Sequence, residues 1–96
     1  MTDKFTRLAR DRECQVRLPS ICNFDSATTV LAHYRLSGLN GMGMKPHSLI
    51  GSWACHSCHD AIDRRRFTDL DRDFVRLAHA EGVMRTIAQL IKEGHI

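Results

Sequence analysis

The sequence predicts a small α+β domain stabilised by a bound metal, and three observations support this fold class. Four cysteines occur as two pairs, a β-branched and aromatic segment lies between the pairs, and apolar residues recur at helical spacing in the last third. In a chain of 96 residues a hydrophobic core gives only marginal stability, so a structural metal would contribute. We expect one domain over residues 1–96, with an N-terminal part at 1–27, a core at 28–66 and a helical scaffold at 67–96.

The composition is that of a soluble globular protein, with 43% hydrophobic and 26% charged residues. No apolar run approaches the roughly 20 residues that span a bilayer, and "MTDKFTRLARDRE" lacks the apolar segment of a secretory signal. We therefore expect a cytoplasmic protein without a membrane partner, whose cysteines serve metal binding or catalysis rather than disulfides. The net charge of +3 has its positive excess within residues 1–66, which suits an anionic partner such as nucleic acid.

The first two thirds of the chain contain short predicted elements. Residues 4–10 favour a short helix, and "CQVRLPSIC", residues 14–22, is expected to form a short strand that ends in a turn at Pro19 and Ser20. "TTVLAHYR", residues 28–35, favours a strand. The glycine-rich "SGLNGMGMKP", residues 37–46, indicates a loop, and "CHDAIDRRR", residues 58–66, has no helix breaker and is expected to be helical.

The last third predicts a long helix. Thr68 and Asp71 resemble a capping arrangement, Gly94 suits a C-terminal cap, and Gly82 is a candidate for a bend. The apolar residues at helical spacing, which we expect to pack on the core, are Leu70, Phe74, Leu77, Met84, Ile87 and Ile91. An interface in a homodimer is the alternative for this face.

Metal binding accounts for all four cysteines. Cys55 and Cys58 have the two-residue spacing of a zinc knuckle, and Cys14 and Cys22 would complete a tetrahedral site for one structural Zn²⁺. Buried free thiols are the alternative for Cys14 and Cys22. "CHSCH" also matches the attachment pattern of c-type haem, but haem would leave the first pair without a role.

A helix over "CHDAIDRRR" would place His59 and Asp63 on one face, because residues four apart are neighbours on a helix. Cys58 and Ile62 form another such pair, rotated by about 100°. One face could therefore serve the zinc and the core while the other presents an imidazole and a carboxylate. A plain surface pair is the alternative for His59 and Asp63.

The order of strand histidine, glycine-rich loop and knuckle-bearing helix carries a resemblance. "AHYRLSGLNGMGMKPHSLIGSWACHSCHDAID", residues 32–63, resembles the HNH or His-Me finger motif, a ββα-metal unit of nucleases. From about residue 14 onward, with "LAH.RL.G" and "AC..CH..IDRR", the chain is similar to small prophage-encoded YbcO-like nucleases. The resemblance implies that His33 is the general base and that His59 binds a catalytic divalent cation, Mg²⁺ or Mn²⁺.

The function expected from this resemblance is hydrolysis of phosphodiester bonds in DNA. HNH motifs often have an aspartate ligand directly before the catalytic histidine, where this chain has Ala32, and helix geometry makes Asp63 its candidate replacement. The candidate substrate contacts are Arg35, His47, Arg64, Arg65 and Arg66. A non-catalytic zinc module that binds nucleic acid or protein is the alternative function, and a c-type haem protein is a remote one.

Overall fold

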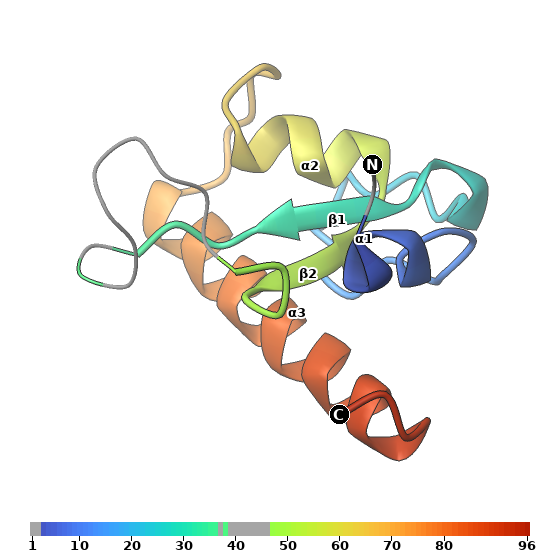
Figure 1. Ribbon diagram of the computed structural model, residues 1–96. Coiled ribbons are helices and arrows are strands. Elements are labelled where there is room, and N and C mark those ends of the chain that lie inside the picture. Colours follow the sequence, from blue (N-terminus) through green and yellow to red (C-terminus); the bar gives the residue numbers. More distant parts are fainter. Residues whose placement is uncertain (1–2, 37, 39–46) are drawn as a thin grey trace.

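The computed structural model describes residues 3–36, 38 and 47–96, and its centre is a two-stranded antiparallel hairpin (Figure 1). Strand β1 (Val30–His33) pairs with β2 (Gly51–Ala54), with Val30 opposite Ala54 and His33 opposite Gly51. Helix α2 (His56–Ile62) follows β2 almost directly, and the long helix α3 (Arg72–Lys92) packs mainly against β2. The predicted small α+β fold is confirmed in this form. The predicted glycine-rich loop lies almost entirely outside the described residues.

Helix α1 (Lys4–Leu8) confirms the predicted N-terminal helix, although it is shorter than residues 4–10. Asp3 caps it by accepting a hydrogen bond from the backbone N–H of Thr6 at 2.9 Å. The hydroxyl of Ser48 donates a second bond to Asp3 at 2.6 Å, and this bond is the main reason why the pKa of Asp3 falls to about 2. The start of the chain is thereby held beside the segment that enters β2.

The strand predicted at residues 14–22 is wrong, since this segment contains no strand. Arg17 and Ser20 have φ angles of 53° and 63°, and left-handed residues break an extended backbone. The backbone N–H of Arg17 lies 3.4 Å from Cys14 Sγ, and the N–H of Cys22 donates to the carbonyl of Leu18 at 2.9 Å. The segment therefore curls around its own cysteine rather than joining the sheet.

The strand predicted at residues 28–35 is confirmed at its centre as β1, while a 3₁₀ turn (Ser26–Thr28) precedes it. The helix predicted through residue 66 ends earlier. Arg64 has a φ of 60°, and the N–H of Arg65 donates to the carbonyl of Asp60 at 2.8 Å, which is the hydrogen bond of a Schellman cap. An arginine occupies the position where glycine is usual, so the sequence carries no stop signal there.

Helix α3 is confirmed as a long helix, but it begins three residues later than a cap at Thr68 predicts. Asp71 is the N-cap and accepts from the N–H of Asp73 at 2.9 Å. Gly94 follows its end with a φ of 81°, as a C-terminal cap requires. Helix α3 is continuous through Gly82, where an added Cβ would lie 3.0 Å from Val16 Cγ2. Gly82 thus permits close packing and does not split the helix.

The predicted buried face of α3 is wrong for four of its six residues. Leu77 and Met84 are 58% and 61% exposed, and Phe74 and Ile91 are also exposed. Leu70, which precedes α3, packs against the core as predicted, and Ile87 is partly buried. The residues that α3 buries are instead Val75, His79, Gly82, Thr86 and Leu90. In a two-stranded sheet some backbone N–H and C=O groups have no partner on the other strand. The buried face of α3 carries polar side chains that pair such groups in the hairpin.

Two contacts supply these partners. The backbone N–H of Trp53 donates to Thr86 Oγ1 at 3.0 Å, and His79 Nε2 lies 3.0 Å from the carbonyl oxygen of Ala32. Aliphatic side chains at these two positions would leave the buried groups without hydrogen bonds.

The core consists of two buried clusters, and the alternation of side chains along β1 and β2 separates them. Leu31 and Trp53 pack with Ala9 and Leu90, whereas Ala32 and Ala54 pack with the cysteine-rich side of the molecule. None of the helices in the described ranges has the length and apolarity that crossing a membrane requires.

Candidate functional site: a cysteine cluster and a histidine cavity

The four cysteines converge although eight to forty-four positions separate Cys14 from the others along the chain. Cys14 and Cys22 come from the curled segment, and Cys55 and Cys58 come from the junction of β2 with α2. All four sulfur atoms lie within 4.8 Å of one another, and none is in a disulfide. Cys14, Cys55 and Cys58 are buried, and Cys22 is half-buried.

This donor set fits a tetrahedral metal. Zn–S bonds of about 2.3 Å place the sulfurs of a tetrahedron about 3.8 Å apart, and Cys22 Sγ lies 3.8 Å from Cys55 Sγ. The backbone N–H of Cys58 points at Cys55 Sγ at 3.4 Å. A hydrogen bond between Cys14 and Cys58 lowers the pKa of the Cys14 thiol and raises that of the Cys58 thiol, so these two sulfurs are in direct contact. The four cysteines could therefore hold a metal such as zinc.

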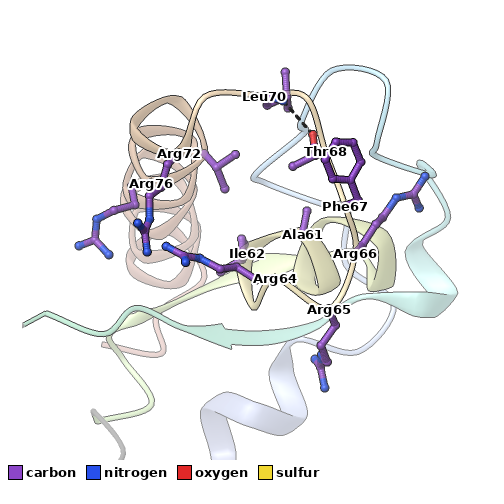
Figure 2. A pocket seen from close by; sticks show the side chains of 11 residues that line it. Ala61, Ile62, Arg64, Arg65, Arg66, Phe67, Thr68, Leu70, Arg72 and Arg76 are labelled. Carbon is purple, nitrogen blue, oxygen red and sulfur yellow. Dashed lines mark hydrogen bonds between the residues drawn. The ribbon is translucent and has the colours of Figure 1, made fainter.

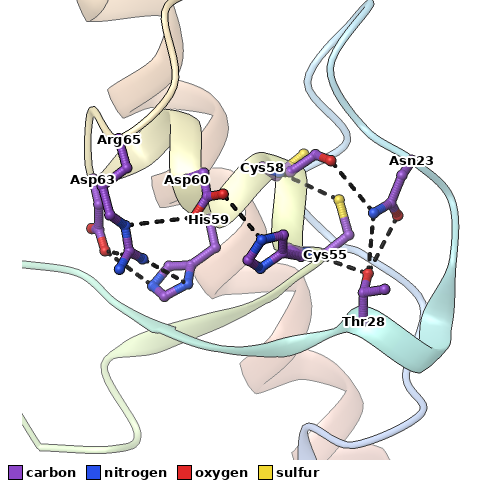
Figure 3. Close-up of polar contacts among 10 residues, drawn as sticks. Asn23, Thr28, Cys55, Cys58, His59, Asp60, Asp63 and Arg65 are labelled. Carbon is purple, nitrogen blue, oxygen red and sulfur yellow. Dashed lines mark hydrogen bonds and ion pairs between the residues drawn. The ribbon is translucent and has the colours of Figure 1, made fainter.

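A polar network ties the two cysteine-bearing segments together (Figure 3). Asn23 donates to Thr28 Oγ1 at 3.2 Å, and the same hydroxyl accepts from the backbone N–H of His56 at 3.2 Å. Asn23 follows the first cysteine pair, and His56 lies within the second. This network therefore holds the two cysteine pairs next to each other.

Helix α2 presents a second group of polar residues away from the sulfurs (Figure 3). His59 Nε2 lies 3.2 Å from Asp63 Oδ2, so the two predicted cation ligands are neighbours. Arg65 contacts both, at 3.5 Å from His59 Nδ1 and 3.1 Å from Asp63 Oδ2, and it lies 3.5 Å from Asp60. A second pair, His56 and Asp60, lies on the same helix at 3.1 Å.

A cavity of about 130 Å³ brings three predicted site residues together. His33 at the end of β1, Arg35 two residues later and Asp63 at the end of α2 all line it. The remaining lining residues are Tyr34, Ile62, Val75, Arg76 and His79. We call this space the histidine cavity. His59 contacts it through Asp63.

Three polar residues of the histidine cavity were absent from the sequence-based site: Tyr34, Arg76 and His79. The rings of Tyr34 and His79 lie 4.9 Å apart, and Arg76 stacks on Tyr34 at 5.0 Å while donating to its hydroxyl at 3.0 Å. Burial lowers the pKa of His79. The signal that could have found His79 is its place in the helical series of Val75, Gly82 and Thr86, which contains too few large apolar residues to stand out.

The other predicted substrate contacts lie elsewhere. Arg64, Arg65 and Arg66 line a larger pocket of about 600 Å³ between α2 and α3. His47 is exposed, with its ring 6.3 Å from that of Phe5 in α1, and it does not line the histidine cavity.

Comparison with known proteins gives a consistent set of relatives. The family model described as "Putative nuclease YbcO" matches residues 3–95. "Putative nuclease YbcO" of Escherichia coli (strain K12) and "Putative nuclease ybcO" of Enterobacteria phage 82 are each 49% identical over 90 residues, covering 94% of this chain and 93% of the relative.

A solved structure is also similar to this chain. "Structure of a putative bacteriophage protein from Escherichia coli str. K-12 substr. MG1655" matches with a TM-score of 0.78 and 43% identity, covering 93% of this chain and 98% of the other. The match therefore extends over nearly the whole of both chains. The chain belongs to the YbcO family.

Proposed function

We propose that this chain is a metal-dependent endonuclease of the HNH type that hydrolyses phosphodiester bonds in DNA. The observation that carries the proposal is the histidine cavity, which is lined both by an imidazole from the end of β1 and by a carboxylate from the end of α2. The names of the YbcO relatives, one of them from a phage, support a nuclease. A zinc ion held by the four cysteines would fix α2 relative to the hairpin and so preserve this geometry.

His33 is the general base of the proposed reaction. A neutral imidazole accepts a proton readily near neutral pH, so His33 can deprotonate the water that attacks the phosphorus. The rim of the histidine cavity adds positive charge through Arg35 and Arg76, which can contact the non-bridging phosphate oxygens.

His59 and Asp63 are the proposed ligands of a divalent cation, Mg²⁺ or Mn²⁺. The carboxylate of Asp63 is a ligand type that Mg²⁺ and Mn²⁺ prefer, and the imidazole of His59 lies 3.2 Å from it, so both could reach one cation whose remaining ligands are water. When bound there, the cation would neutralise phosphoryl charge and stabilise the leaving oxygen. Arg65 contacts both side chains and would therefore compete with a cation for them.

The test is cleavage of supercoiled plasmid and labelled DNA oligonucleotides with added Mg²⁺ or Mn²⁺. His33→Ala should lower the rate by about 10²- to 10⁴-fold, because general-base catalysis typically contributes that much. His56→Ala is the matched control, since the His56 side chain is 69% exposed on α2 and does not line the histidine cavity. It should cleave like the wild type.

Two outcomes would overturn the proposal. A folded, zinc-loaded wild type that cuts no nucleic acid across a broad set of metals and substrates would favour the non-catalytic binding module. Equal cleavage by the wild type and His33→Ala would place the active site elsewhere.

A further inference from the structure

The pocket between α2 and α3 has a strongly cationic lining (Figure 2). Five arginines line it, Arg64, Arg65, Arg66, Arg72 and Arg76, together with apolar residues and Thr68. No acidic side chain among the described residues lines it. Its volume of about 600 Å³ falls within the range of about 300–1,000 Å³ typical of small-molecule sites. We call it the arginine pocket.

The five guanidinium groups differ in their availability. Arg65 is engaged by Asp60 and Asp63, and Figure 2 shows its side chain directed away from the others. Arg64 points toward α3 in the same view, and it forms no ion pair within the described part of the chain, nor does Arg72. Two guanidinium groups of the arginine pocket are therefore without an ion pair among the described residues.

An exposed aromatic ring accompanies this charge. Phe67 lines the arginine pocket from the connection between α2 and α3, and it is 85% exposed. A phenylalanine at this exposure contributes little to the core, so its ring is available for contact with a ligand. Proteins that bind single-stranded nucleic acid combine such rings, on which bases stack, with basic groups that hold the phosphates.

The arginine pocket adjoins the histidine cavity. Ile62, Val75 and Arg76 line both spaces, so the two lie side by side. A strand whose scissile phosphate lies beside His33 would therefore have a nucleotide close to its cleavage site in the arginine pocket.

We propose that the arginine pocket binds an unpaired nucleotide, with its base stacked on Phe67 and its phosphates held by Arg64 and Arg72. The inference rests on the proposed nuclease function and narrows its substrate class to single-stranded or locally unpaired DNA. In a duplex both faces of each internal base are covered by its neighbours, and a base reaches a protein ring only when it leaves the stack.

The experiment measures binding rather than cleavage. Fluorescence anisotropy compares a labelled single-stranded DNA oligonucleotide with a hairpin duplex of the same sequence, at fixed salt and with zinc-loaded protein. His33→Ala is the background for every variant, so that no probe is cut. Phe67→Ala is the test, and Phe24→Ala is the matched control, because Phe24 is 80% exposed and lies outside both pockets.

Phe67→Ala should weaken single-strand binding by about 5- to 100-fold, as the loss of one base–aromatic stack does. Duplex affinity should change less than twofold, and Phe24→Ala should bind both probes like its parent. Equal single-strand affinities for Phe67→Ala and Phe24→Ala would overturn the inference, and so would an equal loss on the duplex. Thermal melting of both variants checks that truncation of an exposed ring leaves the fold intact.

The arginines provide an independent measurement. Arg64→Gln and Arg72→Gln should each reduce the slope of log affinity against log salt for the single strand by about 1, since each removes one phosphate contact. Unchanged slopes would overturn the assignment of phosphates to this pocket. Failure of the nuclease proposal would leave these binding results intact, whereas failure of this inference would leave the cleavage defect of His33→Ala intact.

Discussion

His59 Nε2 lies 3.2 Å from Asp63 Oδ2, and His56 Nε2 lies 3.1 Å from Asp60 Oδ2 in the same arrangement on the same helix. The two pairs differ in their surroundings. Asp63 lines the histidine cavity, whereas His56 points into solvent. Helix α2 therefore contains both a candidate cation site and its own internal control.

We expect His59→Ala to raise the Mn²⁺ concentration required for half-maximal cleavage by at least about tenfold. Loss of a residue that merely orients a ligand typically costs 10- to 100-fold in metal affinity, and loss of the ligand should cost no less. A Mn²⁺ titration of cleavage measures this. His56→Ala should keep the wild-type midpoint, and equal midpoints for the two variants would remove His59 from the cation site.

Cys22→Ala should abolish stoichiometric zinc binding and lower the melting temperature. Metal binding by such clusters is coupled to folding, so the free energy of unfolding should fall by roughly several kcal/mol. Elemental analysis and thermal melting provide the two readouts. Ser57→Ala, which lies between Cys55 and Cys58, should retain one zinc per chain. A Soret band in the absorption spectrum of the wild type would instead support haem.

Truncating a leucine on the buried face of α3 should destabilise the protein far more than truncating one on its exposed face. Leu90 is 3% exposed, so Leu90→Ala should lower the free energy of unfolding by roughly 2–5 kcal/mol. Leu77 is 58% exposed, and Leu77→Ala should change it by less than about 0.5 kcal/mol. Urea denaturation measures both. A large loss in Leu77→Ala would show that a second molecule covers that face.

The buried His79 should make stability depend on pH below neutrality. Burial lowers the pKa of His79 below the ordinary 6.5. Just below pH 6.5 this histidine is therefore protonated in the unfolded chain but still neutral in the folded protein. Stability from this group is present above pH 6.5 and declines as the pH falls from there toward the lowered value.

His79→Gln should therefore be less stable than the wild type at pH 7.5 but should lose less stability by about pH 5.5. Melting temperatures across this range, at constant zinc, give the comparison. Parallel pH profiles for the two proteins would mean that other groups cause the wild-type dependence.

Features that depend on local geometry could be predicted from the sequence alone. The i and i+4 spacing of His59 and Asp63 brings them together in any helix, and Gly94 follows the end of α3 with a positive φ that glycine adopts readily. The spacing of Cys55 and Cys58 likewise indicates a metal site, because two thiols three positions apart can reach one ion from a single turn. A tetrahedral metal needs four ligands, so the sequence also predicted that Cys14 and Cys22 would lie beside Cys55 and Cys58.

Only the tertiary structure decided which stripe of α3 is buried and which residues surround His33. The stripe that contains Leu77 is richer in large apolar residues than the buried stripe of Val75, His79, Gly82, Thr86 and Leu90, so periodicity indicated the wrong face. The hairpin determines the buried face, because Thr86 pairs the backbone N–H of Trp53 and His79 lies against the carbonyl of Ala32. That docking also brings Arg76 and His79 to the histidine cavity, a juxtaposition of residues over forty positions apart that no local pattern contains.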